Sequence, residues 1–154
     1  MAHGLPDWYR GVDIAYQALA QMITRPTYGG AVRTYGLATT LPNDELVFTA
    51  ITGKGMVYGG YVRFDHTASQ KNSKVRLYLD GNMVLDRSFY NMDKYNFIYP
   101  GAYPLVKGVY DDTNFVYSAL IAYGMTFETS ISLAYDEQHG ETFNLYWGIV
   151  YALV

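Results

Sequence analysis

The sequence predicts an all-β fold: a single antiparallel β-sandwich of jelly-roll type, preceded by a short N-terminal helix or arm. Three observations lead to this prediction. Eight or nine short segments of strand-forming residues follow residue 27, separated by turn residues at similar spacing. Several of them alternate apolar and polar side chains, as a strand with one buried face does. With 154 residues, 17% aromatic and 16% charged, the chain fits one folded domain with a sizeable core.

Residues 1–26 are predicted to form a separate N-terminal arm. Apolar side chains within residues 6–23 recur at intervals of three and four, as they do on one face of a helix. Pro6 suits the first helical turn, and Pro26 ends the pattern. Gly11 lowers helix stability by ~1 kcal/mol relative to Ala. An extended arm over part of this segment is therefore the alternative.

Residues 27–154 are predicted to form the sandwich domain. Strands are expected within 31–39, 45–52, 56–64, 74–90 (a hairpin), 105–110, 115–123, 125–135 and 142–154. The pair Gly59-Gly60 inside the third strand indicates a bulge or a close approach of backbones. Segment 115–123 is apolar on both faces and would also suit a helix. A strand is favoured there because strands flank it.

The clearest hairpin lies in residues 74–88, K-V-R-L-Y-L-D-G-N-M-V-L-D-R-S. Residues 80–81, Asp-Gly, are a strong turn signal because Gly adopts positive φ without steric cost. A two-residue loop would place Val75 opposite Asp86 in a regular ladder. A three-residue loop instead pairs Val75 with Leu85, so this register is expected.

The last predicted strand, 142–154, is apolar on both faces. One face carries Phe143, Leu145 and Trp147, and the other carries Tyr146 and Val150. The outer face of a sandwich normally contacts water. An apolar outer face therefore has to be covered, either by the N-terminal helix or by another subunit. The residues expected at a subunit or partner interface are Trp8, Tyr16, Leu19, Tyr146 and Val150.

An aromatic segment follows the hairpin and is expected to be irregular from residue 91 to residue 104. It carries Tyr95, Tyr99 and Tyr103, with Tyr90 just before it. Long ordered loops often have a function. Three interpretations remain open: the loop packs on its own domain, contacts another subunit, or stacks on the sugar rings of a glycan.

Composition narrows the classes of partner. The net charge of −3 and the absence of any basic run argue against a nucleic-acid partner. The chain has no cysteine, no apolar run of membrane-spanning length, and no signal-peptide pattern at its start. We therefore expect neither disulfides nor membrane insertion, and synthesis in a cytoplasm.

No catalytic constellation is evident, and no cofactor or metal is expected. His3, His66 and His139 lie far apart in the sequence. Residues 136–141 contain several potential metal ligands but are favoured as a polar hairpin loop. The turn at Asp111-Asp112 offers oxygen ligands for a cation but lacks the spaced acids of a calcium loop, so a bound cation there is the less favoured alternative.

A family resemblance rests on four stretches: D-W-Y-R-G-V-D-I-A-Y-Q-A-L-A-Q, R-P-T-Y-G-G-A, I-T-G-K-G-M-V-Y-G-G-Y and L-Y-L-D-G-N. Their order resembles that of small jelly-roll structural proteins of tailed-phage virions and spans most of the chain. The resemblance implies a capsid decoration (cement), capsid-associated or tail-associated protein, made in the host cytoplasm. It also implies a symmetric homo-oligomer that contacts other virion proteins, and it brings no catalytic residue.

The expected function is therefore that of a non-enzymatic virion structural protein, which assembles through its N-terminal arm and its apolar β-surface. A trimer is one symmetry consistent with this function. The alternative is a carbohydrate- or receptor-binding module that uses the aromatic segment. An enzyme is a third hypothesis, and its signature would be a cleft that unites His66 or His139 with two acids.

Overall fold

The structure, a computed structural model, describes residues 28–100 and 102–154. The predicted N-terminal helix lies outside the described residues. The elements are β1 (Val32–Thr39), β2 (Glu45–Thr52), β3 (Gly55–Asp65), β4 (Lys74–Leu79), β5 (Asn82–Ser88), α2 (Phe89–Lys94), β6 (Leu105–Asp111), β7 (Val116–Ile121), β8 (Met125–Phe127), β9 (Ser130–Asp136) and β10 (Asn144–Leu153). No helix among the described residues is long and apolar enough to cross a membrane.

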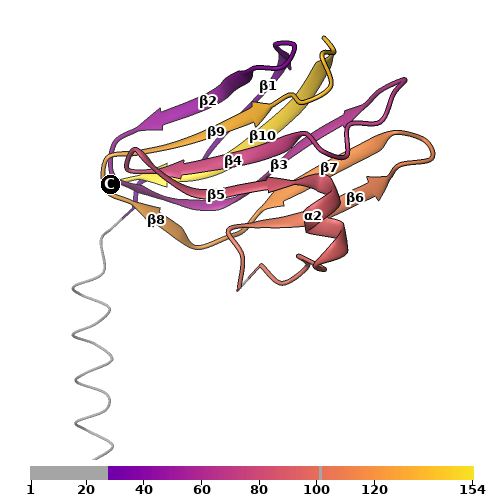
Figure 1. Cartoon of the computed structure of the whole chain (residues 1–154). Helices are drawn as coiled ribbons and strands as arrows, with labels where there is room; N and C mark the ends of the chain where they lie inside the picture. Colours follow the sequence, from indigo (N-terminus) through magenta and orange to yellow (C-terminus); the bar gives the residue numbers. More distant parts are fainter. Residues whose placement is uncertain (1–27, 101) are drawn as a thin grey trace, which may run out of the picture.

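Two antiparallel sheets pack face to face, as Figure 1 shows. The six-stranded sheet has the order β1-β10-β3-β7-β6, and β8 pairs with β3. The four-stranded sheet has the order β2-β9-β4-β5. If β6 and β8 are set aside, the remaining eight strands form two interlocked Greek keys, the connectivity of a jelly roll. The predicted fold class is confirmed.

The core lies between the sheets and is dominated by aromatic rings. The ring of Phe64 on β3 lies 5.4 Å from those of Phe89, Tyr117 and Tyr135 and 4.8 Å from that of Phe143, measured between centroids. All five side chains are buried. Their inclined and edge-on arrangements suit the charge distribution of aromatic rings. Residues from five parts of the chain thus close one core.

The hairpin β4–β5 forms where it was predicted, but the predicted register is wrong. Leu79 pairs with Asn82, so the loop has two residues, and both have positive φ, 52° at Asp80 and 78° at Gly81. These angles suit a two-residue hairpin turn. A bulge at Val84 then places Leu77 opposite Leu85. The bulge restores apolar pairing without a third loop residue, an option that a regular ladder does not offer.

The aromatic segment begins with a helix, which corrects the prediction that it is irregular and that the hairpin continues to residue 90. Helix α2 starts after Ser88, whose hydroxyl accepts a hydrogen bond from the N–H of Asn91. Phe89 and Met92, three residues apart, share its buried face. A serine cap followed by apolar residues at this spacing is a helix-start signal.

Two further expectations are settled by the pairing. Segment 115–123 forms strand β7 and no helix. The predicted bulge in the third strand is confirmed, because the β3–β10 register shifts where Val150 faces Gly59 and Tyr151 faces Val57. Gly59 has φ 148°, a conformation that other residues rarely adopt.

Candidate functional site

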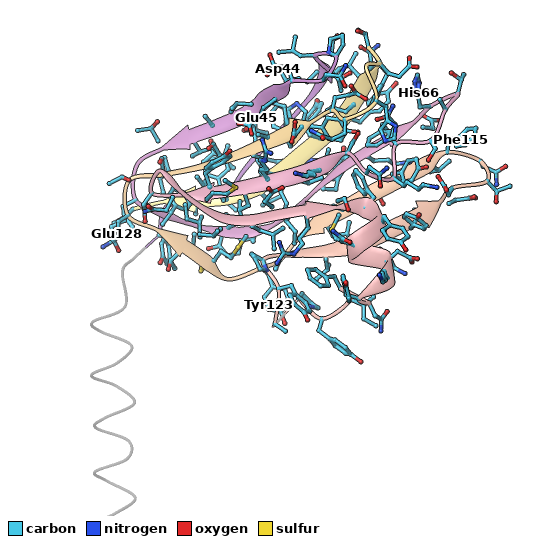
Figure 2. The ribbon with its side chains drawn as sticks, in the orientation of Figure 1. Asp44, Glu45, His66, Phe115, Tyr123 and Glu128 are labelled. Carbon is cyan, nitrogen blue, oxygen red and sulfur yellow. The ribbon has the colours of Figure 1, made fainter. Side chains whose placement is uncertain are left out.

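The outer face of the four-stranded sheet is polar, and its charges are paired. The guanidinium of Arg76 on β4 lies 2.6 Å from the Asp136 carboxylate and also contacts the carboxylates of Glu45 and Asp86. The Tyr78 hydroxyl donates to Glu45 at 3.0 Å. Glu45 marks this surface in Figure 2. This is the solvated outer face expected of a sandwich.

The outer face of the six-stranded sheet is different in character. Leu37 on β1 lies opposite Tyr146 on β10, which in turn lies opposite Arg63 on β3. In the next row, Tyr35 and Tyr61 flank Gly148. Tyr35, Leu37 and Tyr146 have exposed fractions of 69%, 56% and 53%. From here on, the term outer face refers only to this surface of the six-stranded sheet.

Two adjoining depressions hollow the outer face. One, of about 630 Å³, is lined by Tyr61, Arg63, Asp65, Val109, Ser118, Leu120 and Tyr146. The other, of about 520 Å³, is lined by Arg33, Gly59, Gly60, Tyr61, Leu120, Gly148, Ile149 and Val150. Tyr61 and Leu120 belong to both, so the two depressions form one shallow groove. A Cβ on Gly148 would lie 2.8 Å from the Tyr61 ring, so a larger residue at this position would require that ring to shift.

The outer face contains two of the five residues predicted at an interface. Tyr146 lines the larger depression and Val150 the smaller one. Trp8, Tyr16 and Leu19 lie outside the described residues. Tyr35, Leu37 and Tyr61 share this face but were not predicted as site residues. Their alternation in the sequence was a usable signal, but the partner strands that bring them together could not be read from it.

The predicted contact loop is divided by the fold. Tyr90, Tyr95 and Tyr99 are exposed, and the Lys94 ammonium lies 5.8 Å and 5.4 Å from the ring centroids of Tyr90 and Tyr95. Tyr103 is half-buried and stacks on Phe97, with ring centroids 4.0 Å apart. Tyr103 also lines a hollow of about 300 Å³, the other lining residues being Pro100, Ala102, Pro104, Ala122, Tyr123, Gly124 and Met125. Tyr123 is labelled in Figure 2.

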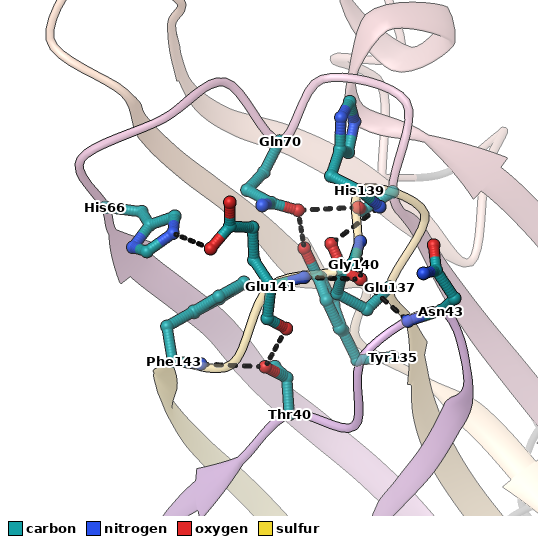
Figure 3. Close-up of polar contacts among 11 residues, drawn as sticks. Thr40, Asn43, His66, Gln70, Tyr135, Glu137, His139, Gly140, Glu141 and Phe143 are labelled. Atoms are coloured by element: carbon teal, nitrogen blue, oxygen red, sulfur yellow. Dashed lines mark hydrogen bonds and ion pairs between the residues drawn. The ribbon is translucent and has the colours of Figure 1, made fainter.

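The acidic loop after β9 is organised by one buried carboxylate, that of Glu137 (Figure 3). Its oxygens accept hydrogen bonds from the backbone N–H groups of Asn43 at 2.9 Å, His139 at 2.7 Å, Gly140 at 2.7 Å and Glu141 at 3.1 Å. Burial acts to raise the pKa of Glu137, but these four donors outweigh burial and lower the pKa. The carboxylate therefore closes the loop and is not placed to act as a base.

Of the three histidines, the structure describes His66 and His139, which lie on separate loops. His66 Nε2 lies 3.8 Å from the Glu141 carboxylate, and its ring stacks on Phe143 at 4.7 Å. The His139 ring is directed away from Glu137, as Figure 3 shows. The nearby Thr40 hydroxyl accepts from the Phe143 N–H at 3.0 Å. The Glu137 and Thr40 side chains thus hold loops of this region together, whereas His66 Nε2 is buried without a hydrogen-bond partner.

The Asp111-Asp112 turn uses both carboxylates in hydrogen bonds within the protein. Asp111 accepts from the N–H groups of Thr113 and Asn114, and Asp112 accepts from Lys71 at 3.1 Å. These hydrogen bonds lower the pKa of both carboxyls, with those from the Asn114 and Ser69 side chains contributing most at Asp111 and Asp112 respectively. Among the described residues, no group of three or more His, Cys, Asp or Glu is arranged to hold a metal ion.

No protein-family model matches the chain, and no curated protein sequence does. Among solved structures, it is similar to a chain of the cyanophage Pam1 capsid asymmetric unit, with TM-score 0.49, 12% identity, and coverage of 84% of this chain and 89% of that chain. It is also similar to VP2 of the infectious bursal disease virus subviral particle, with TM-score 0.39, 12% identity, and coverage of 84% and 33%.

A third likeness is to the Aeromonas sobria serine protease–chaperone complex, with TM-score 0.39, 10% identity, and coverage of 87% of this chain and 29% of that chain. The chain thus spans a third or less of the VP2 and protease-complex chains, and most of the Pam1 capsid chain. With TM-scores below 0.5, these likenesses do not assign the chain to a family.

Proposed function

We propose that this chain is a non-enzymatic structural protein of a virion, a capsid decoration or tail-associated component that assembles through the outer face and the N-terminal segment. The observation that carries the proposal is the contrast between the two sheets. The four-stranded sheet pairs its charges around Arg76 and has exposed apolar residues such as Met83 on its strands, whereas the outer face brings exposed Tyr35, Leu37 and Tyr146 together on the neighbouring strands β1 and β10. Exposed aromatic and apolar side chains that share one face are typical of protein–protein contact surfaces.

The driving force for assembly is the burial of apolar surface between subunits. Burial contributes about 25 cal/mol per Å², before the loss of translational and rotational freedom is subtracted. Tyrosine suits such a surface because its ring is apolar and its hydroxyl remains hydrogen-bonded at the wet rim. Arg63 and Asp65 at the edge of the groove supply polar groups for orientation.

The N-terminal segment supplies the second contact in this proposal. The described chain begins beside the end of β10, where the Gly29 N–H donates to the Leu153 carbonyl at 2.6 Å. Trp8, Tyr16 and Leu19, spaced for one helical face, would be the anchors on a neighbouring subunit. A closed ring, such as a trimer, is the symmetry that such exchanged contacts favour.

Purified particles of the virus that encodes the chain provide the test. Quantitative mass spectrometry should find the chain at a fixed number of copies per particle. A virus carrying Tyr146→Glu should yield particles with fewer copies, because the charge opposes burial of the outer face. Met83→Glu is the matched control, since Met83 is 52% exposed and lies on β5 of the other sheet. Particles that lack the wild-type chain would contradict the proposal.

Glycan binding through the aromatic segment is the second candidate. The exposed rings of Tyr95 and Tyr99, and the hollow beside Tyr123, favour it. Exposed tyrosine rings can stack on sugar faces, and the nearby Lys94 can donate to hydroxyls. Tyr95→Ala with Tyr99→Ala should abolish retention on a glycan array if this candidate holds. Glycan binding through this segment would be excluded if the double variant were retained on the array as well as the wild type, or if the wild type bound no glycan.

A further inference from the structure

Strand β1 is an open edge of the six-stranded sheet. Its eight residues pair with β10 without a register shift, from Val32 opposite Tyr151 to Thr39 opposite Asn144. It carries one charged residue, Arg33, and no proline. Among the described residues, no strand pairs with its second side. Such an edge is a template for pairing with another chain.

The strands at the other three ends of the two sheet orders, β6, β2 and β5, carry features that oppose such pairing. On β6, the Lys107 N–H donates to the Phe97 carbonyl at 2.6 Å, so the aromatic segment occupies its edge. On β2, a register shift follows Val47. β5 carries the charged residues Asp86 and Arg87 and the bulge described above. Bulges, covering loops and charges are the usual devices against edge pairing, and β1 has only the single arginine.

The backbone alternation of β1 identifies its unused hydrogen-bonding groups. The Thr40 N–H donates to the Phe143 carbonyl at 2.8 Å, so Thr40 belongs to a hydrogen-bonded pair. Such pairs alternate along an antiparallel ladder. The even-numbered residues of β1 therefore bond to β10. The odd-numbered residues direct N–H and C=O to the open side, and they are Arg33, Tyr35, Leu37 and Thr39.

We infer that β1 pairs antiparallel with β1 of a second copy, about a two-fold axis through Gly36, and so joins two six-stranded sheets into one. In this register, Tyr35 lies opposite Leu37 of the second copy, and Arg33 lies opposite Thr39. The two-fold axis generates two pairs of the apolar residues Tyr35 and Leu37, and no two residues of like charge lie opposite each other. A two-fold axis through Tyr35 would instead set Arg33 against Leu37. Registers that pair odd with even residues leave the open groups unmatched.

A second copy fits this edge better than the N-terminal segment of the same chain does. Apolar residues in 6–23 are spaced for a helix, and Pro6 and Pro26 each lack an N–H for a ladder. When β1 pairs with β1 of a second copy, in contrast, the residue pattern of one strand complements that of the other about a two-fold axis, as an isologous interface requires. This inference rests on the proposed assembly function and adds a two-fold contact to it, which lies between rings if the chain also forms a trimer.

The chain has no cysteine, which allows a clean cross-linking test. Full-length Tyr35→Cys and Leu37→Cys would be prepared separately, mixed, allowed to exchange, and oxidised in a glutathione buffer. The inferred register brings these two positions to about 5.5 Å between Cα atoms, which suits a disulfide. The mixture should yield covalent heterodimers. Each variant alone should yield few, because identical positions then lie too far apart for a disulfide. Met83→Cys is the control and should yield few covalent dimers.

The outcomes separate the inference from the proposed function. Oligomers by light scattering without the mixed cross-link would overturn the inferred pairing and leave the assembly function standing. Efficient cross-linking of Tyr35→Cys alone would overturn the register. Hydrogen exchange on the wild type is the second readout. The amides of Tyr35 and Leu37 should exchange about tenfold more slowly when the protein is concentrated than when it is dilute. Protection at dilutions where light scattering shows only monomer would assign the edge to the chain's own N-terminal segment and overturn the inference.

Discussion

Leu37 of β1 lies directly opposite Tyr146 of β10 on the outer face, and both side chains are more than half exposed. A cross-strand apolar pair contributes to stability chiefly when its far side is also covered. On the other sheet, the corresponding surface carries the Arg76 ion network. The difference between the two faces is the basis of the proposed contact surface. Four predictions about the stability of the single domain test the structure that forms this surface.

Arg76→Met should lower the free energy of unfolding by about 1–3 kcal/mol, because it leaves buried Asp136 without its cation. Lys54→Met is the matched control. Lys54 pairs with Glu128 at 2.7 Å, but both side chains are largely exposed, so its loss should change stability little. Urea denaturation at pH 7 measures both. Equal effects of the two substitutions would contradict the structure of the ion network.

Glu137→Gln should lower the free energy of unfolding by about 1–3 kcal/mol at pH 7, because its amide group would face backbone donors. Since the pKa of Glu137 is lowered in the fold, its contribution is complete above the ordinary glutamate pKa, about 4.3. The contribution disappears as the pH falls through the folded-state pKa. Urea denaturation should therefore show the gap between wild type and variant narrowing below about pH 4. A gap that widens in acid would refute the assignment.

Asp80→Asn should lower the melting temperature at neutral pH. The backbone N–H groups of Thr129, Ser130 and Glu128 lower the pKa of Asp80 to about 2. Its carboxylate therefore stabilises the fold above the ordinary aspartate pKa, and this stabilisation fades as the pH falls towards 2. Asparagine tolerates the positive φ at this position, so the substitution tests the charge. Circular dichroism melts should show a clearly larger difference between wild type and variant at pH 7 than at pH 2.

Gly60→Ala should lower the free energy of unfolding by about 1–3 kcal/mol or more. The new Cβ would lie 2.5 Å from the Gly148 carbonyl oxygen, and neither backbone can move without disturbing the ladder. Gly30→Ala is the control, because no heavy atom lies within 4 Å of its Cβ position. Thermal unfolding compares the two variants. A stable Gly60→Ala protein would mean that β3 and β10 do not approach as closely as described.

The fold class and most strands could be predicted because alternation and turn residues are local signals. The single strand predicted over 125–135 is wrong, since the chain passes there from β8 in one sheet to β9 in the other. The type of the β4–β5 loop could not be predicted, since it depends on a bulge at Val84 that only the ladder reveals. Helix α2 was not predicted, although Ser88 is a helix-capping residue, because the many tyrosines in this segment suggested an irregular loop.

The outer face was predictable only in part. Tyr146 and Val150 could be assigned to an outer surface from β10 alone. Tyr35 and Tyr61 could not, because they join Tyr146 through strand pairing between segments far apart in the sequence. Glu137 likewise appeared as one acid in a polar loop. Its role depends on Asn43, which lies 94 residues earlier and reaches it only in the folded chain.

The mass of the full-length protein in solution tests the proposed contact surface most directly. Size-exclusion chromatography with light scattering, across a range of concentrations, should give a multiple of the 17.4 kDa monomer mass. Tyr146→Glu should shift that mass towards the monomer, and the equally exposed Met83→Glu should leave it unchanged. A wild-type mass of 17.4 kDa at every concentration would contradict the account.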